Sequence, residues 1–122
     1  MPVLHVYGLP SRFRGRRVLR QILREAAADV PEMKIVPGVI SVFFAPDPAF
    51  NDLGTEIIIY VDGMVKRKER TSRVRAKLTN AIGKAAYEHL RPKIRDLLLV
   101  EVIPRAMVPS KEIATYADVS KL

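Results

Sequence analysis

The sequence predicts an α/β (α+β) fold in which two β-α-β units form a four-stranded mixed sheet with two helices on one face. Three observations predict it. Four short segments are rich in β-branched and aromatic residues, two longer segments repeat apolar residues at helical spacing, and Gly or Pro separates most of them. The order strand, helix, strand occurs twice in 122 residues, a length that suits one domain with one core.

The first unit begins with a strand over residues 3–8, VLHVYG, which stops at Gly8. A helix is expected over 12–29, because apolar side chains recur there every three or four residues. The Ser11 hydroxyl can cap this helix by accepting a free backbone N–H. A buried strand, VISVFFA, is expected over 39–45.

The second unit repeats this order. The strand EIIIYV spans 56–61 and the strand LLLVEVI spans 97–103. The helix between them is expected over about 72–91, with Thr71 or Ser72 as its cap. Because parallel neighbours need a crossover connection, each helix should cover its own pair of parallel strands.

We expect a single domain over 1–122, with unit one at about 2–45, unit two at about 56–104 and a weakly patterned tail at 105–122. A faint internal repeat supports the two units. The tetrapeptide SRFR at 11–14 resembles SRVR at 72–75, and each follows a strand that ends in glycine.

Composition excludes several kinds of site. The chain has no cysteine, which excludes a disulfide scaffold, a thiolate nucleophile and a zinc site with cysteine ligands. Its two histidines, His5 and His89, lie in different predicted elements, so neither a metal nor another cofactor is expected. No segment has the roughly 18 apolar residues of a membrane span, and the N-terminus does not resemble a signal peptide. We therefore expect a cytoplasmic protein that does not bind membranes.

The chain is basic, with 21 Lys and Arg against 13 Asp and Glu and a net charge of +8. Such a field attracts anions, which include nucleic acids and small acids. The predicted strands lack the paired aromatic residues of an RNA-recognition motif, so no specific nucleic acid is expected as a partner.

All four predicted strands are apolar on both faces, which indicates that the sheet is buried on both sides. The two helices can cover only one of these faces. A second copy of the chain is the expected cover for the other, and we predict a homo-oligomer.

A chain that begins Met-Pro, opens its first strand at Pro2 and contains two β-α-β units resembles the tautomerase superfamily. The segment VISVFFAPD (39–47) is similar to the second strand and following Pro-Asp of the macrophage migration inhibitory factor group. The resemblance covers about 2–104 and extends most clearly to small bacterial members. It implies a trimer and a tautomerase or isomerase that moves a proton on a small keto or enol acid.

The same resemblance makes Pro2 the general base. Proline in second position normally permits removal of Met1, which leaves Pro2 with a free secondary amine. In an apolar pocket the cationic form of such an amine is disfavoured, which lowers its pKa and lets it accept a proton near neutral pH. Neighbouring cations would hold the anionic substrate and stabilise the enolate.

Two of these cations lie in the first unit. Arg12 follows Pro2 by ten residues, which is the spacing of a substrate-binding arginine in 4-oxalocrotonate tautomerase. Lys34 precedes the second strand, near the position of a lysine in the site of the macrophage factor. The resemblance implies that both bind substrate.

Three further candidates follow the third strand, namely Arg67, Lys68 and Arg70, where malonate semialdehyde decarboxylase has a pair of arginines. The strand over 39–45 contains no arginine, whereas 4-oxalocrotonate tautomerase has one in its second strand. This difference argues against a dicarboxylate substrate.

Two other interpretations are open at this point. One is a non-catalytic protein with the same fold. The other is a ferredoxin-like binding module with a basic surface, since that fold has the same order of elements. The connection between the second and third strands has about ten residues and is rich in Pro and Asp, which favours two separate units over a direct hairpin.

Overall fold

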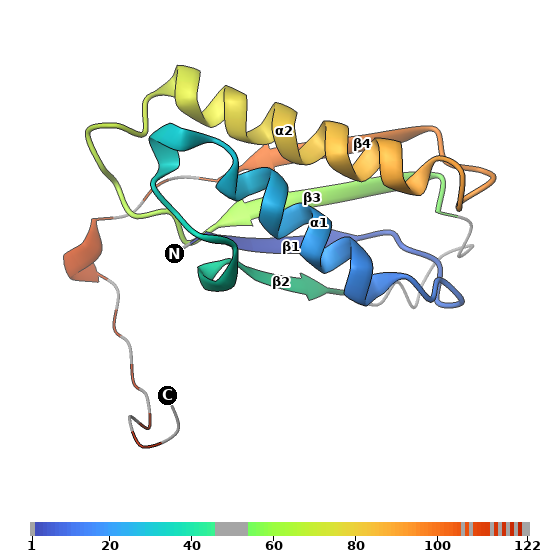
Figure 1. Cartoon of the computed structure of the whole chain (residues 1–122), viewed down its shortest axis with the longest axis horizontal. Coiled ribbons are helices and arrows are strands. Elements are labelled where there is room, and N and C mark those ends of the chain that lie inside the picture. The colour runs from blue at the N-terminus through green and yellow to red at the C-terminus, as the bar shows by residue number, and fades with distance from the viewer. Residues whose placement is uncertain are drawn as a thin grey trace.

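Two β-α-β units share one sheet, with both helices across one of its faces (Figure 1). The computed structural model describes residues 2–45 and 54–105, and positions 107, 109–112, 114, 116, 118 and 120. Its strands are β1 (Val3–Tyr7), β2 (Ser41–Phe44), β3 (Glu56–Asp62) and β4 (Leu99–Pro104). Its helices are α1 (Arg16–Ala28) and α2 (Ser72–Leu90), with short 3-10 helices η1 (Pro31–Met33), η2 (Pro37–Val39) and η3 (Ser110–Glu112).

The strand order is β2-β1-β3-β4. Within each unit the two strands are adjacent and parallel, whereas β1 and β3 pair antiparallel at the centre. The predicted four-stranded mixed sheet with two helices on one face is confirmed. A ferredoxin-like fold splits its β-α-β units so that another strand lies between their strands, and that alternative is therefore wrong.

Alternate side chains of the two central strands point toward the helices and form the core. The buried ones are Leu4, Val6, Ile57, Ile59 and Val61. The helices contribute Leu19, Leu23 and Ala27 from α1, and Val74, Leu78, Ile82, Ala86 and Leu90 from α2. Burying each large aliphatic side chain stabilises the fold by about 1.5–3 kcal/mol, so this layer holds both units together.

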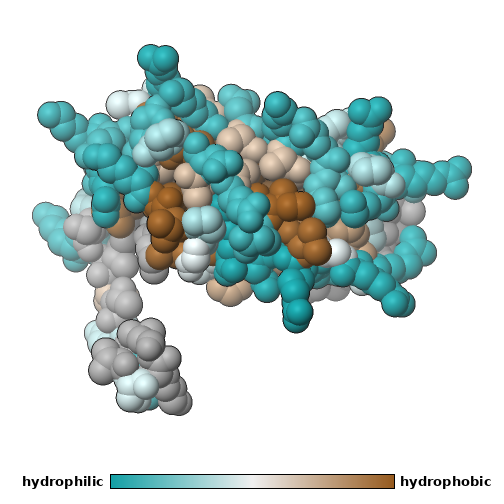
Figure 2. Space-filling view, viewed as in Figure 1, coloured by the Kyte–Doolittle hydropathy of each residue, from teal (hydrophilic) through white to brown (hydrophobic). Residues whose placement is uncertain are grey.

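The outer surface of the helix layer carries mostly hydrophilic side chains (Figure 2). Neither helix, nor any other helix in the described part of the chain, is long and apolar enough to cross a membrane. On the opposite face of the sheet no described helix lies over the strands. Phe43 is 56% exposed there and Tyr7 is 40% exposed.

The start of α1 differs from the prediction. The helix begins at Arg16 rather than at residue 12, and its N-cap is Gly15, so the expected cap at Ser11 is wrong. The preceding residues form a turn instead, in which the Phe13 N–H donates to the Pro10 carbonyl across 3.0 Å. In the second unit, the predicted cap at Thr71 is confirmed, since its hydroxyl accepts from the Val74 N–H.

The predicted internal repeat is confirmed at its two glycines but is wrong for the two tetrapeptides. Gly8 and Gly63 end equivalent strands, and both have positive φ, 97° and 69° respectively. By contrast, residues 11–14 precede α1, whereas 72–75 form the first turn of α2, so the two tetrapeptides are not equivalent.

Each glycine opens a similar loop. In the first unit, Arg16 Nη2 donates to the Pro10 carbonyl across 3.0 Å. In the second, Arg70 Nη1 donates to the Val65 carbonyl across 2.9 Å. Each acceptor carbonyl belongs to the residue two positions after its glycine. In both strand-to-helix loops a guanidinium group therefore donates to the equivalent carbonyl.

Candidate functional site

The predicted base, Pro2, lies at one end of the sheet. At this end β1 and β2 begin and β3 ends, since Val3 pairs with both Ser41 and Asp62. Pro2 stands there, buried, and its carbonyl accepts the Ser41 N–H across 3.4 Å. We call this the Pro2 end.

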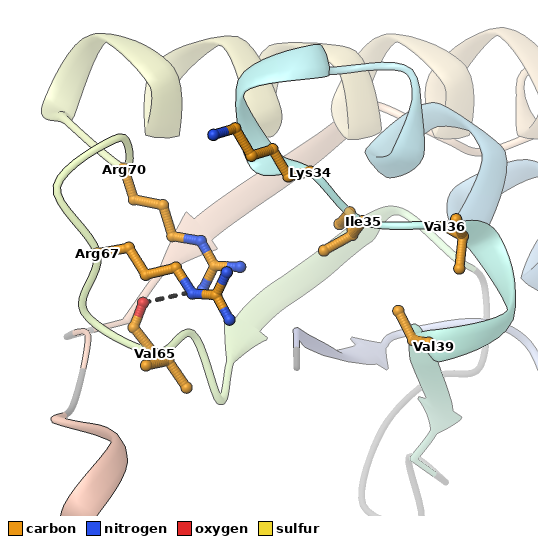
Figure 3. A pocket seen from close by; sticks show the side chains of 7 residues that line it. All are labelled: Lys34, Ile35, Val36, Val39, Val65, Arg67 and Arg70. Carbon is orange, nitrogen blue, oxygen red and sulfur yellow. Dashed lines mark hydrogen bonds between the residues drawn. The ribbon is translucent and has the colours of Figure 1, made fainter.

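A cavity of about 260 Å³ opens at the Pro2 end (Figure 3). It is lined by Lys34, Ile35, Val36, Val39, Val65, Arg67 and Arg70. One group of these residues leads into β2 and the other follows β3, so the topology brings together two segments that are distant in sequence. Pro2 lies at the same end of the sheet but is not among the lining residues.

Arg70 is the buried cation of this cavity, with only 4% of its surface exposed. Its Nη1 donates to Val65, while its Nε is buried and has no hydrogen-bond partner among the described residues. Burial and, secondarily, the neighbouring charge of Arg67 lower the pKa of Arg70 from its ordinary value. Because Arg70 lines the cavity and pairs with no described carboxylate, an anionic ligand bound there would offset its buried charge.

Lys34 forms the opposite wall and takes the left-handed conformation, with φ of 53°. Its Nζ lies 3.6 Å from the Glu69 carboxylate. A second ion pair joins η1 to α2, because Lys77 Nζ donates to Glu32 Oε2 across 2.5 Å. The two pairs tie the segment before β2 to the loop after β3 and to the helix that follows it.

Both carboxyl groups respond to these contacts. The hydrogen bond from Lys77 is the largest cause that lowers the pKa of Glu32. A backbone N–H and then the charge of Lys34 lower the pKa of Glu69. Both side chains are therefore ionised at neutral pH and carry their full charge into the ion pairs.

The structure brings together three of the five predicted substrate-binding cations. Lys34, Arg67 and Arg70 line one cavity. Lys68 is exposed in the adjoining turn and does not line it. Arg12 follows the far end of β1 and is exposed at the other end of the sheet, away from this cavity.

Sequence reasoning missed Glu69 and the Val65 carbonyl. Glu69 is the one acidic residue in the run KRKER (66–70), and this reversal of charge was an available signal. The position of the Val65 carbonyl depends on how the chain folds back after β3, which no residue pattern indicates.

The open face of the sheet holds a second polar cluster. His5 Nε2 lies 3.3 Å from Asp62, which also pairs with Arg105 Nε across 2.7 Å. The His5 ring stacks on Phe43, and the Arg105 guanidinium lies 4.1 Å from the ring centroid of Tyr60. Within the described residues, no group of three His, Asp or Glu is arranged to hold a metal ion.

Comparison with solved structures relates this geometry to known folds. A structure of 5-carboxymethyl-2-hydroxymuconate delta-isomerase superposes with a TM-score of 0.65 at 18% identity, covering 97% of this chain and 89% of that chain. A fused 4-OT, solved as a symmetric trimer, gives 0.63 at 18% identity over 93% and 90% of the two chains. The chain has the tautomerase fold.

A third similar structure is the macrophage migration inhibitory factor of Toxoplasma gondii, with a TM-score of 0.61 at 15% identity over 93% of this chain and 95% of that chain. The predicted resemblance to the tautomerase superfamily is thus confirmed for the fold. No protein-family model matches the sequence, and no curated protein sequence matches it significantly.

Proposed function

We propose that this tautomerase-fold protein is a tautomerase or isomerase that moves a proton on a small keto or enol acid. The observation that carries the proposal is the pair of guanidinium groups of Arg67 and Arg70, which line one cavity at the Pro2 end and form no ion pair with a described residue. The solved structures of the same fold include an isomerase and a member of a dehalogenase family, which supports chemistry on small molecules.

An anion is the ligand that suits this cavity. Burying a cation without a partner is costly, and the cost is recovered when a carboxylate binds and hydrogen-bonds to it. Arg67 lies next to Arg70 in the lining, so a carboxylate can accept from both guanidinium groups (Figure 3). The aliphatic wall formed by Ile35, Val36 and Val39 suits the carbon skeleton of a small acid.

Pro2 is the proposed general base. Once Met1 is removed, its nitrogen is a secondary amine at the head of β1, at the same end of the sheet as the cavity. The amine takes a proton from the carbon next to the substrate carbonyl, which gives an enolate, and then returns it to the oxygen or to another carbon. Arg67 and Arg70 hold the carboxylate and stabilise the negative charge of the enolate.

A homo-oligomer, a trimer by analogy with the fused 4-OT assemblies, is the proposed working form in the cytoplasm. The uncovered sheet face, with Phe43 and Tyr7 exposed, is its proposed contact surface. Arg12 does not line the cavity of its own chain and lies at the other end of the sheet, so its proposed role is at the cavity of a neighbouring chain in the assembly.

The test begins with mass spectrometry of the purified protein. If Met1 is retained completely in protein from its native host, Pro2 has no free amine and the proposed mechanism fails. With Met1 removed, tautomerisation of phenylpyruvate and of 2-hydroxymuconate is measured for the wild type, Pro2→Ala and the control Pro92→Ala. We expect loss of activity in Pro2→Ala alone, and equal rates in all three proteins would remove Pro2 from the mechanism.

A further inference from the structure

The cavity at the Pro2 end is rich in positive charge. Three of its lining residues are cations, Lys34, Arg67 and Arg70. One carboxylate of the chain, Glu69, stands beside them. The charge available to a ligand therefore depends on which cation Glu69 neutralises.

Glu69 pairs with Lys34. The distance from Lys34 Nζ to Glu69 Oε1 is 3.6 Å, and the Lys34 amine is directed away from the two guanidinium groups (Figure 3). A backbone N–H and the charge of Lys34 lower the pKa of Glu69, so this carboxylate is ionised at neutral pH and competes with any ligand carboxylate for the amine.

The two arginines are less closely paired. Neither Arg67 nor Arg70 forms an ion pair with a described residue, and Glu69 acts on them only as a more distant charge, with a smaller effect on the pKa of Arg70 than burial or Arg67 has. Arg67 also contributes to the lowered pKa of Arg70, because two like charges lie close together. One ligand carboxylate held between the two guanidinium groups would offset this repulsion.

From this arrangement, and resting on the proposed function, we propose that Glu69 sets the charge class of the substrate. Arg67 and Arg70 form a subsite for one carboxylate, and Glu69 occupies the cation that a second carboxylate would need. The site then accepts monocarboxylic keto or enol acids and discriminates against dicarboxylic ones. Glu69 is a specificity-determining residue that acts through Lys34 and by direct repulsion.

The effect is moderate because the pair is exposed to water, with 65% of the Lys34 side chain and 45% of the Glu69 side chain accessible. Exposed ion pairs contribute little to stability, so a substitution at Glu69 leaves the fold intact. Freeing the amine of Lys34 should strengthen binding of a second carboxylate by about two- to fivefold, the range expected for an exposed charge pair.

The test compares two probes that differ by one carboxylate, propionate and succinate, in NMR titrations of the full-length protein. Binding is measured rather than turnover, so the result does not depend on Pro2. We expect the wild type to bind succinate no more tightly than propionate. In Glu69→Gln, affinity for succinate should rise about two- to fivefold relative to propionate, and Glu69→Gln with Lys34→Gln should restore the wild-type ratio.

The matched control is Glu88→Gln, which removes the same charge from another Lys–Glu pair, Lys84 with Glu88 on α2. It should leave the ratio unchanged, which separates a local effect from one of net charge. A ratio that is the same in Glu69→Gln and the wild type overturns the inference, as does a wild type that binds neither probe. If the wild type binds propionate and Glu69→Gln shifts the ratio, but no tautomerisation is found, then the proposed function fails and the inference stands.

Discussion

Arg70 donates a hydrogen bond from Nη1 to the carbonyl oxygen of Val65 across 2.9 Å, and this bond fixes a buried guanidinium at the wall of the cavity. The Arg70 carbonyl in turn accepts a hydrogen bond from Arg75 Nη1 across 2.7 Å. The side chain and the backbone of Arg70 are therefore both held in place in the loop after β3. The side chain is thereby oriented before any ligand arrives, which reduces the entropy that binding would otherwise cost.

Replacing Arg70 with Met should separate binding from stability. The unbranched apolar side chain keeps most of the volume and removes a buried charge that pairs with no described carboxylate, which offsets part of the cost of losing the hydrogen bond to Val65. The free energy of unfolding should therefore fall by no more than about 2 kcal/mol. Affinity for propionate should fall about tenfold or more, because charge-assisted hydrogen bonds are lost.

Urea denaturation and NMR titration measure the two quantities. Lys68→Met is the matched control, since this cation is exposed in the adjoining turn and does not line the cavity. It should change neither quantity. An Arg70→Met protein that is strongly destabilised, or that keeps full affinity for propionate, would contradict the role given to Arg70.

Gly8 should tolerate no side chain. Its φ is 97°, and a Cβ added there would lie 2.1 Å from the carbonyl oxygen of Glu56 in β3. Because the added Cβ would clash with the backbone of β3 rather than with a flexible side chain, Gly8→Ala must distort the sheet. We expect a loss of roughly 2–3 kcal/mol or more in the free energy of unfolding.

The control is Gly38→Ala in η2, where an added Cβ meets nothing within 4 Å. Urea denaturation should place this variant within about 0.5–1 kcal/mol of the wild type, on the stable side if the backbone tolerates alanine. Similar losses in both glycine variants would show that the conformation at Gly8 is not the cause.

The fold was predictable because its signals are local. Each of the four apolar strands and two amphipathic helices has a residue pattern that is complete within a short stretch of sequence. Thr71 caps α2, as its position in the sequence predicts. The predicted start of α1 was wrong because the turn at 10–13 depends on hydrogen bonds to the Pro10 carbonyl, including one from Arg16. Such contacts compete with helix formation and leave no periodic signal.

The candidate site was predictable only as a list of cations. Sequence could propose Lys34 and Arg70 by resemblance, but their meeting in one cavity depends on two segments converging at the Pro2 end. That convergence buries Arg70 and pairs Lys34 with Glu69. It also leaves Arg12 away from the cavity. Each is a tertiary relationship, which single-sequence patterns do not encode.

The buried imidazole of His89 should make the free energy of unfolding depend on pH. Its Nε2 is buried and has no hydrogen-bond partner in the part of the chain that the structure describes, and burial followed by the charge of Lys93 lowers its pKa from the ordinary value of 6.5. The unfolded chain therefore binds a proton at a higher pH than the folded chain does. Stability should be fully present above pH 6.5 and should decrease as the pH falls below that value.

Urea midpoints at pH 7.5 and 5.5 measure this change, and replacing His89 with Gln should reduce it. His5→Gln is the control, because it removes the other histidine of the chain and retains His89. If the His89→Gln protein loses as much stability between the two pH values as the wild type does, the buried imidazole is not responsible.

Phe43 tests the proposed assembly. Its ring is 56% exposed on the open sheet face and stacks on His5, whose neighbour Asp62 also holds Arg105. If a second copy covers this face, Phe43→Glu buries an unpaired charge at the contact, and the assembly should dissociate to monomers in sedimentation velocity runs.

Val18→Glu provides the comparison, because Val18 is equally exposed at 55% but lies on α1, on the opposite side of the sheet. This variant should sediment like the wild type. The two substitutions add the same charge at similar exposure, so a difference between them assigns the contact to the sheet face. Dissociation by Val18→Glu alone would instead place the contact on the helix layer, and a Phe43→Glu protein that sediments like the wild type would leave the sheet face without a role in assembly.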